Sequence, residues 1–345
     1  MDLISSTDQL VVPAHMSTRG SSSKRVGTSR SATIHLSRNI ILASLQVRGI
    51  LIRERANTIV VIHAGFFALV GALTKKLMPR VSLVLYAGGS DVLGTLGKGL
   101  RGMVARALRI WSFRQSDLVL TNGAHLKEAV IDIWRDANVY DVPHGIKTPN
   151  LKMKSCDYSA LRIFAPRPWT EPYNNEQLLS AIEALPPEFH SKVSVTANVH
   201  GISKREMARL QKMAKTIPIC MLDGYDFDDR YRYFSSACVV VSMSRSDGIP
   251  NAVLEAAYAG CTLILGDINA TRDLVLRYEL KAHLVEIDAP IKLARKLQEL
   301  VIGHDIVHAD ILHNRGVIYR SFGSSKASQN ISVHLNRVSH RNGKF

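Results

Sequence analysis

The stretch SRSDGIPNAVLEAAYAG, residues 244–260, decides the fold class that the sequence predicts. An apolar run at 238–243 precedes it and predicts a buried strand. A tight turn at Asp247-Gly248 follows, and then Pro250, a residue typical of the first helical position. A strand, a glycine turn and a helix N-terminus together form an anion site, because the free backbone N–H groups and the helix dipole point the same way.

Two carboxylates frame this turn. Asp247 lies on the turn itself, and Glu255 lies in a helix body, AVLEAAYA, that is otherwise apolar. A lone carboxylate among apolar side chains costs free energy unless a partner accepts it. The spacing leaves two interpretations of Glu255 open: an ion pair with a neighbouring Lys or Arg, or a contact with a ligand.

The letters DGIP at 247–250, with EA at 255–256, resemble the signature of the retaining GT-B glycosyltransferases of group 1, the glycogen-synthase-like superfamily. In that family the first acid lies beside the donor sugar and the second Glu holds the ribose of the nucleotide. This chain has Asp247 where Glu is usual, so the carboxylate is one methylene shorter. The resemblance implies donor-binding roles for Asp247, Gly248, Ile249, Pro250, Asn251 and Glu255.

Composition bounds the size and the partners of the protein. A chain of 345 residues with 46% hydrophobic residues is long enough for two α/β domains with their own cores. The net charge of +15 and the pI near 9.8 favour anionic partners, such as nucleic acid, an anionic membrane surface or the phosphates of a nucleotide sugar. The sequence has no zinc-finger spacing or aromatic RNP-like strand, which argues against nucleic acid.

Cysteine usage and hydropathy bear on localisation. The four cysteines are scattered without a CxxC pair, which predicts a reducing compartment and no structural zinc: Cys156, Cys220, Cys238 and Cys261. The N-terminus lacks the pattern of a signal peptide. The longest apolar run, 59–73, is interrupted by His63 and favours a strand followed by a helix over a membrane span. We therefore expect a cytoplasmic protein, and the alternative is a protein bound peripherally to a membrane.

The first half of the chain predicts a parallel sheet. From residue 34 onward, β-branched runs alternate with helical patterns, which is typical of a doubly wound sheet. Ligands bind at the carboxyl ends of such strands, where His63 and the segment 88–91 fall. Gly-Ser-Asp at 89–91 is similar to the family's His-Gly-Ser-Asp on the acceptor side, with Gly88 at the usual His position. The acceptor-side candidates are Gly89, Ser90, Asp91, His63 and His144; the alternative for the two histidines is a structural hydrogen bond.

Residues 98–114 form a candidate basic amphipathic helix. Apolar residues follow helical spacing from Leu100 to Trp111, and four cations are distributed over the other faces. The favoured interpretation is a helix that covers the sheet and exposes a basic face. The alternative is a helix that binds a membrane surface.

The resemblance implies a complete architecture. It predicts an α/β protein with two doubly wound, Rossmann-like domains that face a cleft, the GT-B type. Val-Pro-His-Gly-Ile at 142–146 resembles the segment that closes the family's first domain. The expected domains are an acceptor-side domain over 1–150, a nucleotide-sugar-binding domain over 151–310, and a C-terminal helix or tail over 311–345 that packs back on the first domain. The composition of residues 1–31 predicts a disordered basic segment.

Arg167 follows a predicted strand at 161–165. Group 1 enzymes place an Arg here to neutralise the donor diphosphate, a task that suits the planar guanidinium. Their second cation, a Lys, would fall near Pro172 and is missing. Asp226-x-Asp228 imitates the metal-binding DxD of another glycosyltransferase fold, but its position before a helix favours capping. The resemblance implies that no metal is needed.

The expected function is that of a retaining hexosyltransferase. It would move a sugar from a nucleotide diphosphate sugar, a UDP-sugar first of all, to a glycan or lipid-linked acceptor, with Asp247 and Arg167 as catalytic residues and no cofactor. One alternative is a catalytically silent GT-B scaffold or partner subunit of a glycan-assembly complex, which the missing His and Lys and the Asp at 247 favour. Another is a GT-B epimerase or phosphorylase, but no cofactor lysine stands in a recognisable motif.

Overall fold

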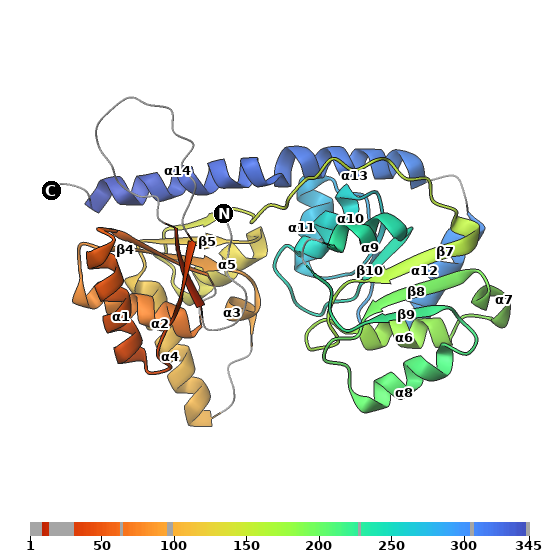
Figure 1. Cartoon of the computed structure of the whole chain (residues 1–345), viewed down its shortest axis with the longest axis horizontal. Helices are drawn as coiled ribbons and strands as arrows, with labels where there is room; N and C mark the ends of the chain where they lie inside the picture. The colour runs from red at the N-terminus through yellow and green to blue at the C-terminus, as the bar shows by residue number, and fades with distance from the viewer. Residues whose placement is uncertain are drawn as a thin grey trace. The chain divides into compact units, whose positions relative to one another are not determined.

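The chain folds into two compact units (Figure 1). The computed structural model describes residues 9–13, 31–62, 65–94, 99–226, 229–303 and 307–342. The first unit holds the described residues up to Asn122, Leu126–Val142, and the described residues from Ile331 onward. The second unit holds Gly123–His125 and Pro143–Asn330.

The first unit contains a parallel sheet in the order β3-β4-β5-β6. Its strands are β3 (Thr58–Ile62), β4 (Ser82–Ala87), β5 (Leu118–Thr121) and β6 (Val139–Asp141). All six residues of β4 are buried, because apolar side chains on both faces of a parallel sheet need cover. Leu83 and Leu85 belong to one apolar core, and Val84 and Tyr86 belong to another. Alternate side chains of β4 therefore pack on opposite faces of the sheet.

Helices cover both faces of this sheet. On one face, α2 (Phe66–Leu77) lies between α1 (Ile40–Arg53) and α4 (Gly99–Gln115), and each outer helix packs against α2. On the other face, Ile331 and Val338 of α14 (Ser324–Asn342) pack with Val84 and Tyr86. The short α3 (Ser90–Leu93) and α5 (Ala124–Ile133) complete the unit's helices among the described residues. The C-terminal part of the chain is therefore divided at Ile331, and not at the expected residue 311.

The N-terminal residues correct one expectation. Residues 1–31 were expected to lack order, but β1 (Gln9–Pro13) pairs antiparallel with β2 (Ser31–His35) in a separate two-stranded sheet, with Val11 opposite Thr33. Each strand has only five residues, and the two strands pair across a long stretch of sequence. A local hydrophobic pattern therefore does not predict this sheet. Residues 14–30 lie outside the described part of the chain.

The second unit contains a six-stranded sheet in the order β12-β11-β10-β7-β8-β9, with every pair parallel. The chain runs outward from β7 to β9 on one side, returns to the centre, and runs outward from β10 to β12 on the other. The switch point therefore lies between β7 and β10, the place where such sheets bind ligands at the carboxyl ends of their strands. The strands are β7 (Leu161–Ala165), β8 (Val193–Asn198), β9 (Ile219–Leu222), β10 (Val239–Ser242), β11 (Thr262–Gly266) and β12 (His283–Val285).

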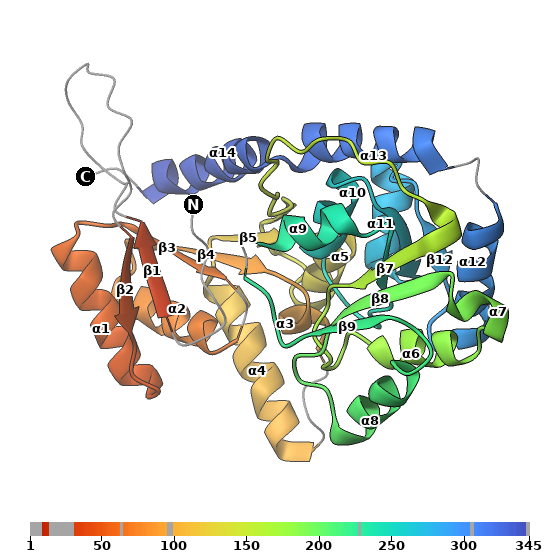
Figure 2. The same cartoon turned by 45° about the vertical axis from the view of Figure 1, so that its right-hand side comes forward.

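Two apolar cores flank the second sheet. Figure 2 shows the helices that lie on its two faces. Ile163 of β7 belongs to one core and Phe164 to the other, because neighbouring side chains of a strand point to opposite faces. One face is covered by α6 (Asn175–Glu183), α8 (Lys204–Met213) and α12 (Pro290–Ile302), with α7 (Pro187–His190) nearby in the chain. The other face is covered by α9 (Arg230–Ser236), α10 (Asn251–Tyr258), α11 (Asn269–Tyr278) and α13 (Val307–Phe322).

The segment that was expected to close the first domain belongs to the second unit. Ile146 N donates to Phe322 O at 2.7 Å, and Ser324 N donates to Ile146 O at 2.9 Å. Gly145 has a φ of +74°, and a Cβ at this position would lie 2.4 Å from the Cβ of Ala327. The second unit therefore begins at Pro143, eight residues before the expected boundary at 151.

Gly145→Ala is expected to lower the free energy of unfolding by more than about 2 kcal/mol. A left-handed backbone costs an L-residue roughly 1–2 kcal/mol, and the clash with Ala327 adds to that cost. Gly224→Ala is the matched control, because Gly224 has a φ of +78° but no atom of the described residues within 4 Å of its added Cβ. Urea unfolding of both variants separates the two costs, and equal losses would contradict the packing argument.

Candidate functional site

Arg167 and Asp247 meet at the switch point of the second sheet. Arg167 follows the carboxyl end of β7, and Asp247 follows the carboxyl end of β10, its neighbour in the sheet. Arg167 Nη2 donates to Asp247 Oδ2 at 2.8 Å. The guanidinium also stacks on the ring of Tyr173, with 3.9 Å between Cζ and the ring centroid. The structure thus brings together two residues that the sequence singled out separately.

This ion pair is largely withdrawn from water. The side chains of Arg167 and Asp247 are 15% and 17% exposed. Burial raises the pKa of Asp247, while the positive charge of Arg167 and a hydrogen bond from the Gly248 backbone oppose that shift. Arg167 Nε and Ser244 Oγ are buried and find no hydrogen-bond partner among the described residues. A buried donor without a partner costs roughly 1–3 kcal/mol, which an incoming anionic oxygen can recover.

The start of α10 provides backbone donors beside this pair. Pro250 is the N-cap residue of α10, one position earlier than the first helical position that the sequence predicted. No side chain of the described residues caps this end of the helix. Asn251 is exposed and Ile249 is buried, so the turn is anchored by Ile249 and opens to solvent at Asn251. The N–H groups of the first turn can therefore meet an anion.

Glu255 has a partner of its own. The residue is buried, and its Oε1 accepts a hydrogen bond from Arg230 Nε at 2.6 Å. Burial raises the pKa of Glu255, and the Arg230 guanidinium opposes the rise. Burial together with the negative charge of Glu255 raises the pKa of Tyr225 to about 12. Of the two interpretations left open by the sequence, the structure contains the ion pair. Glu255 thus contacts Arg230, whereas Asp247 contacts Arg167.

His125 is a residue of the site that sequence reasoning missed. Its Nε2 lies 2.9 Å from the backbone oxygen of Asp247, and its Nδ1 lies 3.5 Å from Oδ2 of Asp273. The same carboxylate oxygen accepts from the backbone N–H of Ala124 at 3.1 Å. The apolar run 118–121 shortly before His125 was the available signal, since strand ends in such sheets meet ligands. The imidazole holds the backbone of the Asp247 turn in place.

The acceptor-side candidates of the first unit form a loop after β4. Asp91 accepts hydrogen bonds from Gly88 N at 3.1 Å and from Gly89 N at 2.7 Å, so its carboxylate fixes the loop. Gly89 has a φ of +147°, which favours glycine there. Ser90 begins α3. His63 lies outside the described residues, and His144 is a half-buried residue of the second unit with an interaction of its own.

The DxD-like segment is only partly described. Asp229 is the N-cap residue of α9, and its backbone N–H donates to Asp226 O at 3.1 Å. Asp229 stands at the N-cap position that the capping interpretation requires. Its carboxylate, however, makes no capping hydrogen bond to the described residues of this helix. Asp228 lies outside the described residues.

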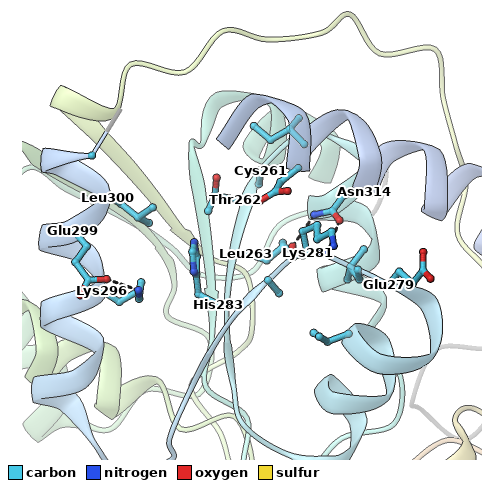
Figure 3. A pocket seen from close by; sticks show the side chains of 16 residues that line it. Cys261, Thr262, Leu263, Glu279, Lys281, His283, Lys296, Glu299, Leu300 and Asn314 are labelled. Atoms are coloured by element: carbon cyan, nitrogen blue, oxygen red, sulfur yellow. Dashed lines mark hydrogen bonds and ion pairs between the residues drawn. The ribbon is translucent and has the colours of Figure 1, made fainter. Parts of the chain in front are cut away.

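A separate hollow of about 350 Å³ lies at the amino ends of β11 and β12 in the second sheet (Figure 3). It is lined by Thr262 and Leu263 at the start of β11, His283 at the start of β12, and Lys296 and Glu299 of α12. Arg167 and Asp247 follow the opposite ends of their strands, so this hollow is distinct from the switch-point site. Its cations and carboxylates are mixed, which gives it no preference for an anion.

Comparison with known proteins agrees with this geometry. Residues 164–302 match the family model described as Glycosyl transferases group 1. No curated protein sequence matches the chain significantly. Sucrose-phosphate synthase from Thermosynechococcus elongatus is similar in structure, with a TM-score of 0.71, 12% identity, and coverage of 86% of this chain and 77% of that one.

Two further solved structures share the fold. Anabaena HepE in complex with UDP-glucose has a TM-score of 0.68 and 13% identity, covering 86% of this chain and 82% of that one. The UDP-forming α,α-trehalose-phosphate synthase from Burkholderia vietnamiensis has a TM-score of 0.62 and 12% identity, covering 88% and 77%. The predicted fold class, two Rossmann-like α/β domains of the GT-B type, is confirmed. The family match over residues 164–302 lies within the second of these two domains.

Proposed function

We propose that the protein is a retaining hexosyltransferase that takes its sugar from a nucleotide diphosphate sugar. One observation carries this proposal: the half-buried Arg167–Asp247 pair at the switch point, in which Arg167 Nε is buried and finds no hydrogen-bond partner among the described residues. A diphosphate supplies the acceptor oxygens that this nitrogen needs. The group 1 match over 164–302 supports the same substrate class, and HepE was solved with UDP-glucose, which makes a UDP-sugar the first donor to test.

The residues divide the work as follows. Arg167 and the N–H groups at the start of α10 stabilise the negative charge of the departing nucleotide diphosphate, the largest electrostatic demand of the reaction. Asp247 holds the sugar hydroxyls beside the reacting carbon. Glu255 binds the ribose through Oε2, the carboxylate oxygen that makes no hydrogen bond to the described residues. These cationic and backbone groups take the place of a metal, so we propose neither metal nor cofactor.

The acceptor is a glycan or a lipid-linked sugar, met on the acceptor side by Gly89, Ser90 and Asp91. We place the protein in the cytoplasm, at or near an anionic membrane surface. Its four cysteines are free thiols, as is usual in a reducing compartment. Among the described residues, no helix combines the length and the apolar character that a membrane span requires.

A panel of UDP-, GDP- and ADP-sugars is expected to yield at least one ligand that stabilises the protein. At a hundredfold excess over its dissociation constant, such a ligand adds about 2.7 kcal/mol to the free energy of unfolding, which a thermal-shift assay detects. The stabilising donor, labelled in its sugar, is then incubated with lipid and glycan extracts. NMR of the product should show the anomeric configuration of the donor. An inverted product would contradict retention, and no stabilisation by any sugar nucleotide would contradict the donor site.

A catalytically silent GT-B scaffold is the second candidate. The commitment of Glu255 to Arg230 favours it, because a carboxylate held in a buried ion pair is less available to a nucleotide. The scaffold and the enzyme differ in one result. A scaffold gives no transfer and no donor hydrolysis with any sugar nucleotide that it binds, whereas the transferase consumes its donor when an acceptor is supplied.

A further inference from the structure

The helix α4 turns an apolar stripe toward solvent. Leu100, Met103 and Val104 are 76%, 69% and 51% exposed, and Leu108 continues the stripe one turn further. Gly102, Ser112 and Phe113 are the buried residues of this helix. The sequence favoured a helix that exposes a basic face, but the structure also exposes these four apolar side chains.

The helix α1 repeats this arrangement. Its exposed apolar residues are Ile41, Leu42, Leu45 and Ile52, at 62%, 54%, 45% and 58% exposure. Helical spacing places them on one stripe, opposite the buried Ala43, Val47 and Leu51. Single exposed apolar residues are normal in proteins, but neighbouring helices that each expose four apolar residues along one side are not, and such surfaces mark an interaction site.

The two stripes belong to one layer of helices. Both α1 and α4 pack against α2, so the three helices lie side by side on one face of the first sheet (Figure 2). Leu77, at the end of α2, is also exposed. We call the outward side of α1, α2 and α4 the helical face. It is a surface of the first unit alone, and residues of the second unit contribute nothing to the stripes.

Arginines flank the apolar stripes. Helical geometry places Arg48 beside the α1 stripe and Arg101 and Arg114 on the two sides of the α4 stripe, and all three are exposed. Arg53 is exposed as well, although Glu54 is its ion-pair partner. Residues 31–122 contain twelve Lys or Arg against three Asp or Glu. The helical face is therefore apolar along its ridges and positive between them.

We propose that the helical face docks on an anionic lipid bilayer. An interfacial helix buries its apolar side at the boundary of headgroups and acyl chains, and each Lys or Arg near an anionic surface strengthens the electrostatic attraction. Arginine suits this position, since its stem packs on apolar surface while the guanidinium reaches the phosphates. A second copy of the chain fits less well, because it would place the same arginines against one another. The proposal does not depend on the glycosyltransferase activity.

The test is co-flotation of the full chain with vesicles. Vesicles of phosphatidylcholine with a quarter of phosphatidylserine are expected to carry the protein, at least tenfold more than pure phosphatidylcholine, and raised salt should release much of it. Leu100→Ser with Val104→Ser is expected to weaken this partition at least tenfold, and Ile41→Ser with Leu45→Ser provides a second, independent variant. Arg101→Gln with Arg114→Gln should weaken binding to anionic vesicles alone.

Two controls make the result specific. Leu276→Ser changes an apolar residue of α11 that is 80% exposed in the second unit, and Arg295→Gln removes an exposed arginine of α12. Both should leave flotation unchanged, and circular dichroism verifies that every variant is folded. Losses as large in the controls, equal binding to neutral vesicles, or no flotation would overturn the proposal. Light scattering that shows a dimer abolished by Leu100→Ser with Val104→Ser, without vesicle binding, would assign the surface to a second copy.

Discussion

Arg167→Ala is expected to weaken the binding of a nucleotide diphosphate sugar by roughly ten- to a hundredfold. Each charge-assisted hydrogen bond contributes about 1.5–3 kcal/mol, and 1.4 kcal/mol corresponds to a factor of ten in affinity. Arg167 offers such a bond from its buried Nε, which has no hydrogen-bond partner within the described ranges of the chain. Calorimetry with the donor measures the loss. Arg295→Ala removes an equal charge from the surface of the same unit and should leave the affinity unchanged.

Two further readouts separate the role of Arg167 from a general loss of structure. Arg167→Lys keeps the charge but not the planar fork, so it should recover only part of the affinity. Removal of Arg167 should also raise the pKa of Asp247 further, because the guanidinium is the charge that holds it down. A carboxyl whose folded-state pKa is raised destabilises the fold when ionised, so stability is gained as the pH falls through that pKa toward the ordinary value. Urea unfolding should show a larger gain on acidification in Arg167→Ala than in the parent protein. Unchanged donor affinity would mean that the diphosphate is met elsewhere.

The regular part of the fold could be predicted because the strands are apolar and β-branched. β7 (Leu161–Ala165) begins and ends at the predicted residues. β3 (Thr58–Ile62) lies at the start of the apolar run 59–73, for which a strand followed by a helix was expected. The β1–β2 pairing could not be predicted, because its register depends on contacts between segments about twenty residues apart in sequence. The outward orientation of α4 was missed for a related reason. Helical spacing identifies an apolar stripe, but not which neighbour covers it.

The site could be predicted as a set of residues but not as a geometry. Arg167 and Asp247 were identified separately, each through its resemblance to a group 1 motif, and their contact depends on β7 and β10 being neighbours in the sheet. That strand order is a long-range property of the chain. Arg230, the partner of Glu255, was not identified, although an apolar helix that contains one carboxylate requires a cation somewhere. Nothing local to 251–258 indicates that this cation lies 25 residues earlier.

The buried pair of Glu255 and Arg230 yields the largest expected effect on stability. Glu255→Gln should lower the free energy of unfolding by roughly 3–5 kcal/mol, because the guanidinium of Arg230 is then left buried without its counter-charge. The side chains of Glu255 and Arg230 are only 8% and 4% exposed, so the pair is screened little by water. Chemical denaturation of Glu255→Gln, Arg230→Gln and the double variant measures the coupling between them. The double variant should be less destabilised than the sum of the single changes, and additive losses would contradict the ion pair's contribution.

The same variant decides whether Glu255 also binds the ribose, since one oxygen can serve Arg230 while the other meets the ligand. We expect Glu255→Gln to bind the nucleoside diphosphate at least tenfold more weakly under conditions where it remains folded, because a charge-assisted hydrogen bond to a ribose hydroxyl is lost. A thermodynamic cycle with 2′- and 3′-deoxy nucleotides isolates this contact. Removal of the hydroxyl that Glu255 binds should weaken the parent protein but have little further effect on Glu255→Gln. If both proteins respond equally to each deoxy analogue, Glu255 serves the fold alone, and the ribose must be held by another group of the second unit.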